Sequence, residues 1–168
     1  MTKLSETGFQ FGVQDAPLTL TVFTNLACPH CAAFFNNYET ELLPAIENRQ
    51  LRLVLKPFDK PKIGLLKGNL VHLFLDYEDQ ARVNPIILQL FKDQAEWKAL
   101  TDSELQTYLN ENYNLEVQPG NTERSLTITQ EAVAFDATSV PTALLSKHGG
   151  TPVKIEQAEL TQELQAVS

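Results

Sequence analysis

The stretch Val22-Phe23-Thr24-Asn25-Leu26-Ala27-Cys28-Pro29-His30-Cys31-Ala32-Ala33-Phe34 decides the fold, because a strand pattern gives way to a helix pattern within it. Residues 18–24 are rich in β-branched and aromatic side chains, which predicts a strand. After the strand, apolar residues recur at helical spacing: Phe34, Phe35, Tyr38, Leu42 and Ile46. Pro29 suits the first helical position, where a missing N–H costs nothing. Both cysteines are therefore expected at the start of a helix that follows a strand.

The remainder of the chain also contains both predicted helices and predicted strands. A capping box at residues 101–104 opens one helix, and Pro44 is expected to kink or restart the first helix. A last amphipathic helix carries Leu160, Leu164 and Val167. The other expected segments are a strand over 51–56, a helical stretch over 61–137, and two strands over 142–145 and 153–155 around a turn at 148–150. This order indicates an α/β domain with a mixed sheet and a helical insertion.

Composition excludes several classes of protein. The chain has 168 residues, 43% hydrophobic and 20% charged, which fits one ordinary globular domain. With Lys+Arg 13 against Asp+Glu 21, it has a net charge of −8 and no basic cluster, so we expect no nucleic-acid partner. No apolar run reaches the length of a membrane span. Residues 1–8 contain no apolar signal-peptide core, so we expect a cytoplasmic protein, or an exported one if a signal has been removed.

The only two cysteines are separated by two residues, which leaves three interpretations. They form a redox pair, half of a metal site, or two bystanders. A structural zinc site needs four ligands, and only His30 lies near the cysteines, while His72 and His148 are isolated in the sequence. We therefore expect no metal. His72 is expected to be a partly buried packing residue on a helix, and His148 a solvated residue of a turn.

As a redox pair, the two cysteines would have different tasks. The first, Cys28, would lie at the positive end of the helix dipole, which favours its thiolate, and the thiolate is the form that attacks disulfides. We predict that the intervening residues, Pro29 and His30, tune this thiolate and so the redox poise. Cys31, deeper in the helix, would resolve the mixed disulfide that Cys28 forms. This chemistry needs no cofactor.

At this level the sequence resembles the DsbA-like thiol–disulfide oxidoreductases of the thioredoxin superfamily. Three features carry the resemblance: the stretch 22–34, the later Ser139-Val140-Pro141-Thr142, and the helical block between them with Leu90-Phe91 and Trp97. It covers residues 9–167 of the single chain 1–168. It implies a thioredoxin-like fold, with a mixed central sheet flanked by helices, built from residues 9–60 and 138–168. Residues 61–137 would form an all-helical insertion.

The resemblance also implies an activity and further site residues. Val140 and Pro141 would form a cis peptide that faces the cysteines and binds an extended substrate segment. The helical insertion would cap the site and help to shape a substrate groove. The expected partners are protein thiols and disulfides, together with an unknown redox partner. Whether the protein acts as an oxidase, a reductase or an isomerase stays open, as does its oligomeric state.

One position departs from the family pattern, and two alternative functions remain open. Many relatives carry a buried acidic residue where this chain has Val22, so either water or another group deprotonates Cys31, or turnover as a reductant is slower. Lys56 is a nearby charge, but we expect it to be a solvated lysine at the end of a strand. The alternatives to disulfide exchange with proteins are a reaction with a small glutathione-linked substrate and a non-catalytic binding or chaperone module. Relatives of the first kind usually carry a serine in the motif, which the intact CPHC lacks.

Overall fold

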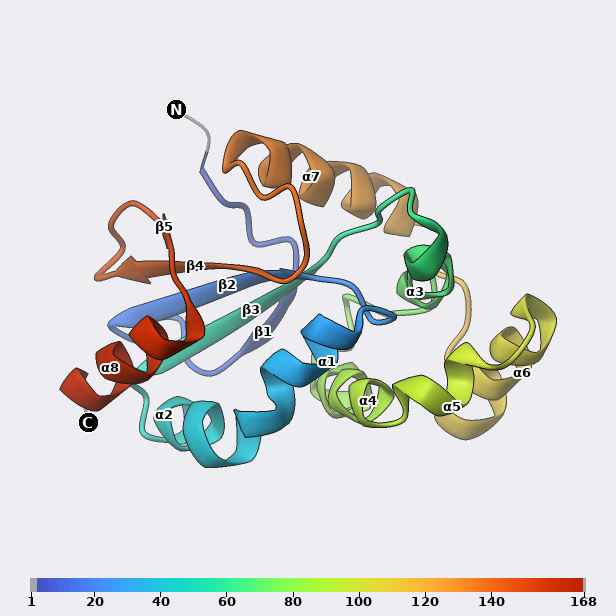
Figure 1. The fold of residues 1–168 in the computed structure, drawn as a ribbon, viewed down its shortest axis with the longest axis horizontal. Helices are drawn as coiled ribbons and strands as arrows, with labels where there is room; N and C mark the ends of the chain where they lie inside the picture. The colour runs from blue at the N-terminus through green and yellow to red at the C-terminus, as the bar shows by residue number, and fades with distance from the viewer. Residues whose placement is uncertain (1–2, 168) are drawn as a thin grey trace.

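One mixed sheet of five strands in the order β1-β3-β2-β4-β5 forms the centre of the molecule (Figure 1). The computed structural model describes residues 3–167. Its strands are β1 (Phe9–Phe11), β2 (Leu18–Thr24), β3 (Leu51–Pro57), β4 (Thr142–Lys147) and β5 (Val153–Lys154). Its helices are α1 (Pro29–Phe34), α2 (Leu43–Glu47), α3 (Leu66–His72), α4 (Gln80–Lys92), α5 (Gln94–Lys98), α6 (Asp102–Tyr113), α7 (Asn121–Ala134) and α8 (Gln157–Val167). The expected mixed sheet flanked by helices is confirmed.

Strand β2 occupies the middle of the sheet. It pairs in parallel with β3, with Val22 opposite Leu55, and antiparallel with β4, with Val22 opposite Ala143. The predicted strand over 18–24 is confirmed, and the predicted hairpin is formed by β4 and β5. Strand β1, which pairs antiparallel with β3, was not expected, because three residues are too few to show an alternating pattern.

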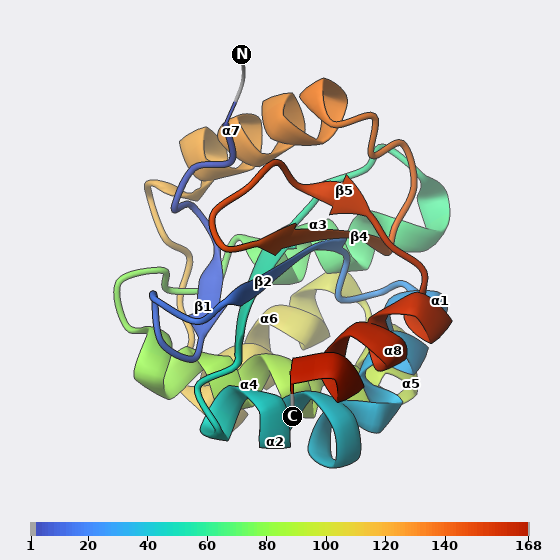
Figure 2. The same ribbon diagram turned by 90° about the vertical axis from the view of Figure 1, so that its left-hand side faces the viewer.

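Helices cover both faces of the sheet (Figure 2). The larger hydrophobic core lies between one face and helices α1, α2, α4 and α8, and it includes Leu20, Val22 and Cys31. The smaller core lies under α7 on the other face and includes Phe23 and Ile128. Successive strand residues point to opposite faces, which is why Val22 and Phe23 belong to different cores.

The first helical region is interrupted, as Pro44 led us to expect. After α1 the chain forms a 3-10 turn (Phe35–Asn37) and a π-helical turn (Tyr38–Leu42), and α2 then begins with Pro44 in its first turn. Proline donates no backbone hydrogen bond, so it is well tolerated in the first turn of a helix, where α2 places Pro44.

The segment between β3 and β4 contains α3, α4, α5, α6, α7 and a 3-10 turn (Ile63–Leu65). The capping box is confirmed: the Thr101 hydroxyl accepts from the Glu104 N–H, and the Glu104 carboxylate accepts from the Thr101 N–H. Helix α7 lies on one face of the sheet and α4 on the other, while α3, α5 and α6 lie beyond the end of the sheet (Figure 1). Boundaries of the insertion at 61 and 137 stay a prediction. Within residues 3–167, no helix is both long and apolar enough to cross a bilayer.

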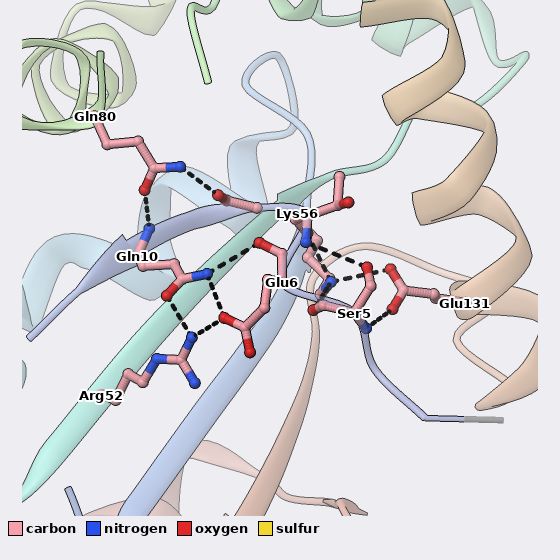
Figure 3. A network of polar contacts seen from close by, with 9 residues as sticks. Ser5, Glu6, Gln10, Arg52, Lys56, Gln80 and Glu131 are labelled. Atoms are coloured by element: carbon pink, nitrogen blue, oxygen red, sulfur yellow. Dashed lines mark hydrogen bonds and ion pairs between the residues drawn. The ribbon is translucent and has the colours of Figure 1, made fainter. Parts of the chain in front are cut away.

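The prediction of a solvated Lys56 is wrong. Its side chain is fully buried under α7, with Nζ 2.9 Å from Glu131 Oε1 and also donating to the carbonyls of Ser5 and Thr7 at 3.0 and 2.6 Å (Figure 3). The sequence pattern shows that Lys56 follows Leu55 in a strand. It does not show that helices cover both faces of the sheet, including the face on which Lys56 lies. Because Lys56 lies on the face opposite Val22 and Cys31, its charge is directed away from the cysteines.

This ion pair fastens the N-terminal segment to the sheet. Burial lowers the pKa of Lys56, and the neighbouring Glu131 carboxylate acts in the opposite direction. The Ser5 N–H donates to the same carboxylate, so one buried pair joins β3, α7 and the chain before β1. A buried charge without its partner is costly, which makes this pair a constraint on the fold.

Glu131→Gln is therefore expected to destabilise the protein by about 3 kcal/mol, because it leaves the Lys56 ammonium buried without a counter-charge. Urea unfolding measures the change. The matched control is Glu39→Gln, which breaks the exposed pair between Lys92 and Glu39 at 3.3 Å and should cost less than about 1 kcal/mol. Equal costs for the two variants would contradict this account of the buried pair.

Candidate active site

The CPHC motif lies where β2 passes into α1. Helix α1 begins at Pro29 as predicted, and Cys28 is its N-cap, with extended backbone angles of φ −81 and ψ 120. Pro29 and His30 are exposed on the surface, while Cys31 faces the core from the first turn. Both cysteines are free thiols in this structure.

A second segment, distant in sequence, completes the site. The peptide bond between Val140 and Pro141 is cis, and both residues are half-buried. The Cys28 sulfur is 3.6 Å from the Val140 carbonyl oxygen, to which its thiol donates. The fold thus brings together the four residues of the motif and the Val140-Pro141 segment, as the resemblance implies.

The two thiols have different surroundings. Cys28 retains 5% of its surface exposed, whereas Cys31 retains none. Burial raises the pKa of Cys31 to about 12, and the nearby Cys28 acts in the same direction. The Thr24 hydroxyl and the Asn25 N–H, which is 3.5 Å from the Cys31 sulfur, act against this rise. Both cysteines are thus buried, but only Cys28 retains any exposed surface.

Helices α3 and α5 hold the loop that precedes Cys28. The Gln94 amide donates to the carbonyls of Leu26 and Cys28 at 2.7 and 2.9 Å. The Lys98 ammonium donates to the Ala27 carbonyl at 2.8 Å, and the Leu26 N–H donates to His72 Nε2 at 3.2 Å. With the bonds inside the loop, every backbone N–H and carbonyl of residues 25–28 has a partner. The helical segment between β3 and β4 therefore positions Cys28.

His72 is buried, as expected, but it does more than pack. Because its Nε2 accepts from Leu26, its ring proton is on Nδ1 and is donated to Asp59 at 2.6 Å. Burial alone would raise the pKa of Asp59, but the bonds from His72 and from the Ser125 hydroxyl outweigh it and lower that pKa. The chain Ser125–Asp59–His72–Leu26 thus anchors the loop to α7. His148 is exposed in its turn, as predicted.

Asn25 ties the loop to α3 from the other side. Its amide donates to the Phe58 carbonyl at 3.1 Å and to Asn69 at 2.9 Å, and its oxygen accepts from Ala27 N–H at 3.0 Å. Gly68 of α3 packs directly on this side chain, since a Cβ there would lie 1.8 Å from Asn25 Oδ1 and 2.8 Å from the Ala27 nitrogen. Only glycine allows this approach.

A pocket of about 450 Å³ opens beside the motif. Its lining includes His30 and Phe34 of α1, Pro141 and Thr142 at the cis segment, and Lys154 and Gln157 near the end of the chain. No residue of 61–137 lines it. In the described part of the chain, no group of three His, Cys, Asp or Glu side chains is arranged to hold a metal ion.

The sequence interpretation did not identify the side chains that hold the loop. Gln94 and Lys98 are four residues apart, a spacing that puts both on one face of a helix, but nothing in the sequence shows what that face meets. A glycine inside a helical pattern, such as Gly68, does signal close packing. The partner of that glycine is visible only in the structure.

Comparison with known proteins assigns the family. The family model described as thioredoxin matches residues 4–161. The chain belongs to the thioredoxin family. No curated protein matches it. Within this thioredoxin family member, the matched segment contains every element from β1 to β5 and the CPHC motif.

Solved structures agree on the fold of this thioredoxin family member. A conserved protein of unknown function from Enterococcus faecalis V583 is 29% identical, with a TM-score of 0.82 over 95% of this chain and 90% of that one. The catalytic domain of Proteus mirabilis ScsC is 15% identical, with a TM-score of 0.70 over 96% and 91%. MdbA, a thiol-disulfide oxidoreductase from Corynebacterium diphtheriae, is 13% identical, with a TM-score of 0.66 over 98% and 91%. The resemblance to DsbA-like oxidoreductases thus holds for the fold.

Gly68→Ala is expected to destabilise the protein by about 2–3 kcal/mol, because the new methyl group overlaps Asn25 and the backbone of the loop. Urea unfolding measures this cost. Gly64→Ala is the matched control, since a Cβ there meets nothing within 4 Å. If both alanine variants unfold at the same urea concentration, the close packing of α3 on the loop is wrong.

The raised pKa of Cys31 predicts a pH dependence of stability. In the unfolded chain the thiol loses its proton near about pH 8.5, whereas the folded protein retains it to about pH 12. The stabilisation is therefore complete below about pH 8.5 and is lost as the pH rises towards 12, with a slope that approaches about 1.4 kcal/mol per pH unit.

Urea unfolding of Cys28→Ala and of the double variant Cys28→Ala with Cys31→Ala, between about pH 8 and about pH 10.5, isolates this effect. The shared Cys28→Ala background removes the thiol that interacts with Cys31, so the difference between the two unfolding free energies should shrink as the pH rises. Parallel curves would show that burial does not hold the proton on Cys31.

Proposed function

We propose that this protein is a thiol–disulfide oxidoreductase that exchanges disulfides with protein substrates through Cys28 and Cys31. The observation that carries the proposal is the contrast between the two sulfurs. Cys28 lies at the start of a helix, beside the cis Val140–Pro141 segment and near a pocket, whereas Cys31 is fully buried behind it. One accessible sulfur backed by one protected sulfur is what a two-step exchange requires.

In the first step the Cys28 thiolate attacks one sulfur of a substrate disulfide. A bond forms between Cys28 and that sulfur, and the electron pair of the broken S–S bond leaves with the other substrate sulfur as a thiolate. Cys28 is the N-cap of α1, and the backbone N–H groups of the first turn have no partner within the helix, so they can donate to negative charge that develops on the sulfur during the exchange. Pro29 and His30, between the cysteines, are proposed to tune the reactivity of Cys28.

In the second step the Cys31 thiolate attacks the Cys28 sulfur. The Cys28–Cys31 disulfide forms, and the second substrate sulfur leaves as a thiolate, so the substrate gains the two electrons that the protein loses. Run in reverse, the same steps introduce a disulfide into a reduced substrate. The direction depends on the reduction potential of the pair and on the compartment, and isomerisation needs both directions.

The pocket beside the motif is proposed to receive the substrate. It is large enough for a few side chains of an extended segment, at about 450 Å³, and the exposed His30 and the cis Pro141 both line it. An extended chain laid along Val140 would bring a cysteine next to Cys28, since the Val140 carbonyl is 3.6 Å from that sulfur. Val140 and Pro141 are therefore the proposed substrate-binding residues.

Cys28→Ser is expected to abolish reduction of insulin, because Cys31, the other cysteine of the chain, is fully buried. Cys31→Ser should instead accumulate a mixed disulfide between Cys28 and the substrate, visible by mass spectrometry under non-reducing conditions. The two variants are matched, since each removes one sulfur and keeps the side-chain size. Full activity in the Cys28→Ser protein would refute the proposed function.

A further inference from the structure

Thr24, the last residue of β2, has a buried hydroxyl that the fold does not otherwise use. The residue is fully buried, and its Oγ1 makes no hydrogen bond of ordinary length within the described part of the chain. The Thr24 backbone is occupied elsewhere, because its carbonyl accepts from the Phe58 N–H at 2.7 Å. Burying a hydroxyl without a partner costs about 1–3 kcal/mol, so this position calls for an explanation.

The hydroxyl faces the sulfur of Cys31. Thr24 shares a sheet face with Val22, two residues earlier, and that face carries the core in which Cys31 lies. The next residue, Asn25, directs its N–H to the same sulfur at 3.5 Å. The Thr24 hydroxyl acts to lower the pKa of the Cys31 thiol, against the rise that burial causes. Cys31 lies in the larger apolar core, so the Thr24 hydroxyl and the Asn25 N–H are polar groups in otherwise apolar surroundings.

A hydroxyl in this position interacts unequally with the two forms of Cys31. A neutral thiol accepts hydrogen bonds only weakly, whereas a thiolate is an ionised acceptor, and hydrogen bonds to ionised groups are about twice as strong. The Thr24 hydroxyl can thus form only a weak hydrogen bond to the resting thiol, and a stronger one when negative charge develops on the sulfur. An interaction that strengthens as charge develops accelerates the reaction.

We propose that the Thr24 hydroxyl donates a hydrogen bond to the Cys31 thiolate and so makes Cys31 competent to resolve the mixed disulfide. This inference rests on the proposed function and adds a residue to it. Thr24 keeps its proton throughout. Cys31 gives its proton to water or to a departing thiolate, and the Cys31 electron pair then forms the bond to Cys28. The bond between Cys28 and the partner breaks, and its electron pair leaves on the partner sulfur.

The two steps separate in a reaction of the reduced protein with dithiobis-nitrobenzoate. Attack by Cys28 releases one coloured thiolate and leaves a mixed disulfide, and attack by Cys31 then releases the second. Stopped-flow absorbance gives both rates in one experiment. The variants are Thr24→Val, which replaces the hydroxyl with a methyl group, Thr24→Ser, which retains the hydroxyl, and Thr24→Ala as a second variant without it. Thr21→Val is the matched control, because Thr21 is also buried in β2 but points to the opposite face.

Thr24→Val and Thr24→Ala should slow the second release by about tenfold, the equivalent of about 1.4 kcal/mol in the barrier, and leave the first release unchanged. Thr24→Ser should restore the second rate, and Thr21→Val should change neither rate. A purely structural role for Thr24 would not slow the second release while leaving the first unchanged. The hydroxyl-free variant with the higher melting temperature is used for the comparison.

An unchanged second rate in both hydroxyl-free variants overturns the inference, and so does a Thr24→Ser protein as slow as Thr24→Ala. Equal slowing of both releases also overturns it, because the hydroxyl would then act on the loop as a whole. Failure of the proposed function gives a different result: the wild-type protein then shows no first release, or reacts with dithiobis-nitrobenzoate but does not reduce insulin. The two ideas can therefore fail separately.

Discussion

The chemistry of this protein depends on the hydrogen bonds that hold the backbone of residues 25–28. This loop joins the central strand to the helix that carries the cysteines, and it is buried, so each backbone group needs a partner. Gln94, Lys98 and His72 supply partners from the helical segment, and Asn25 supplies another from within the loop. The position of Cys28 is thus set by residues far from it in sequence.

The fixed loop gives the two cysteines their different environments. Cys28 remains at the rim beside the cis Val140–Pro141 segment, while Cys31 is directed into the core under β2. Burial makes the inner thiolate costly, and nearby donors reduce that cost only in part. The buried charges of Lys56 and Glu131 do not help, because they lie on the other face of the sheet. The site thus separates a sulfur at the rim from a buried one, and the proposed two-step exchange rests on this contrast.

The sequence predicts the elements that have strong local signals. The strand before the motif, the helix that begins at Pro29 and the capping box at Thr101 are all confirmed, because propensity and capping act over a few residues. The burial of Lys56 could not be predicted, since it depends on α7 covering that face. The contacts of Gln94 and Gly68 could not be predicted either, because they form between segments far apart in the chain. The sequence motif locates the cysteines, and tertiary packing determines how they are held.

The central claim is that Cys28 and Cys31 form one reversible redox couple inside this fold. The most direct measurement equilibrates the protein in glutathione buffers of graded potential, quenches with acid and determines the state of each cysteine by mass spectrometry. The account predicts a single two-electron transition between the dithiol and an intramolecular Cys28–Cys31 disulfide, with the midpoint reporting the direction of exchange. Cysteines that stay reduced across the series, or that bind glutathione without joining each other, would contradict it.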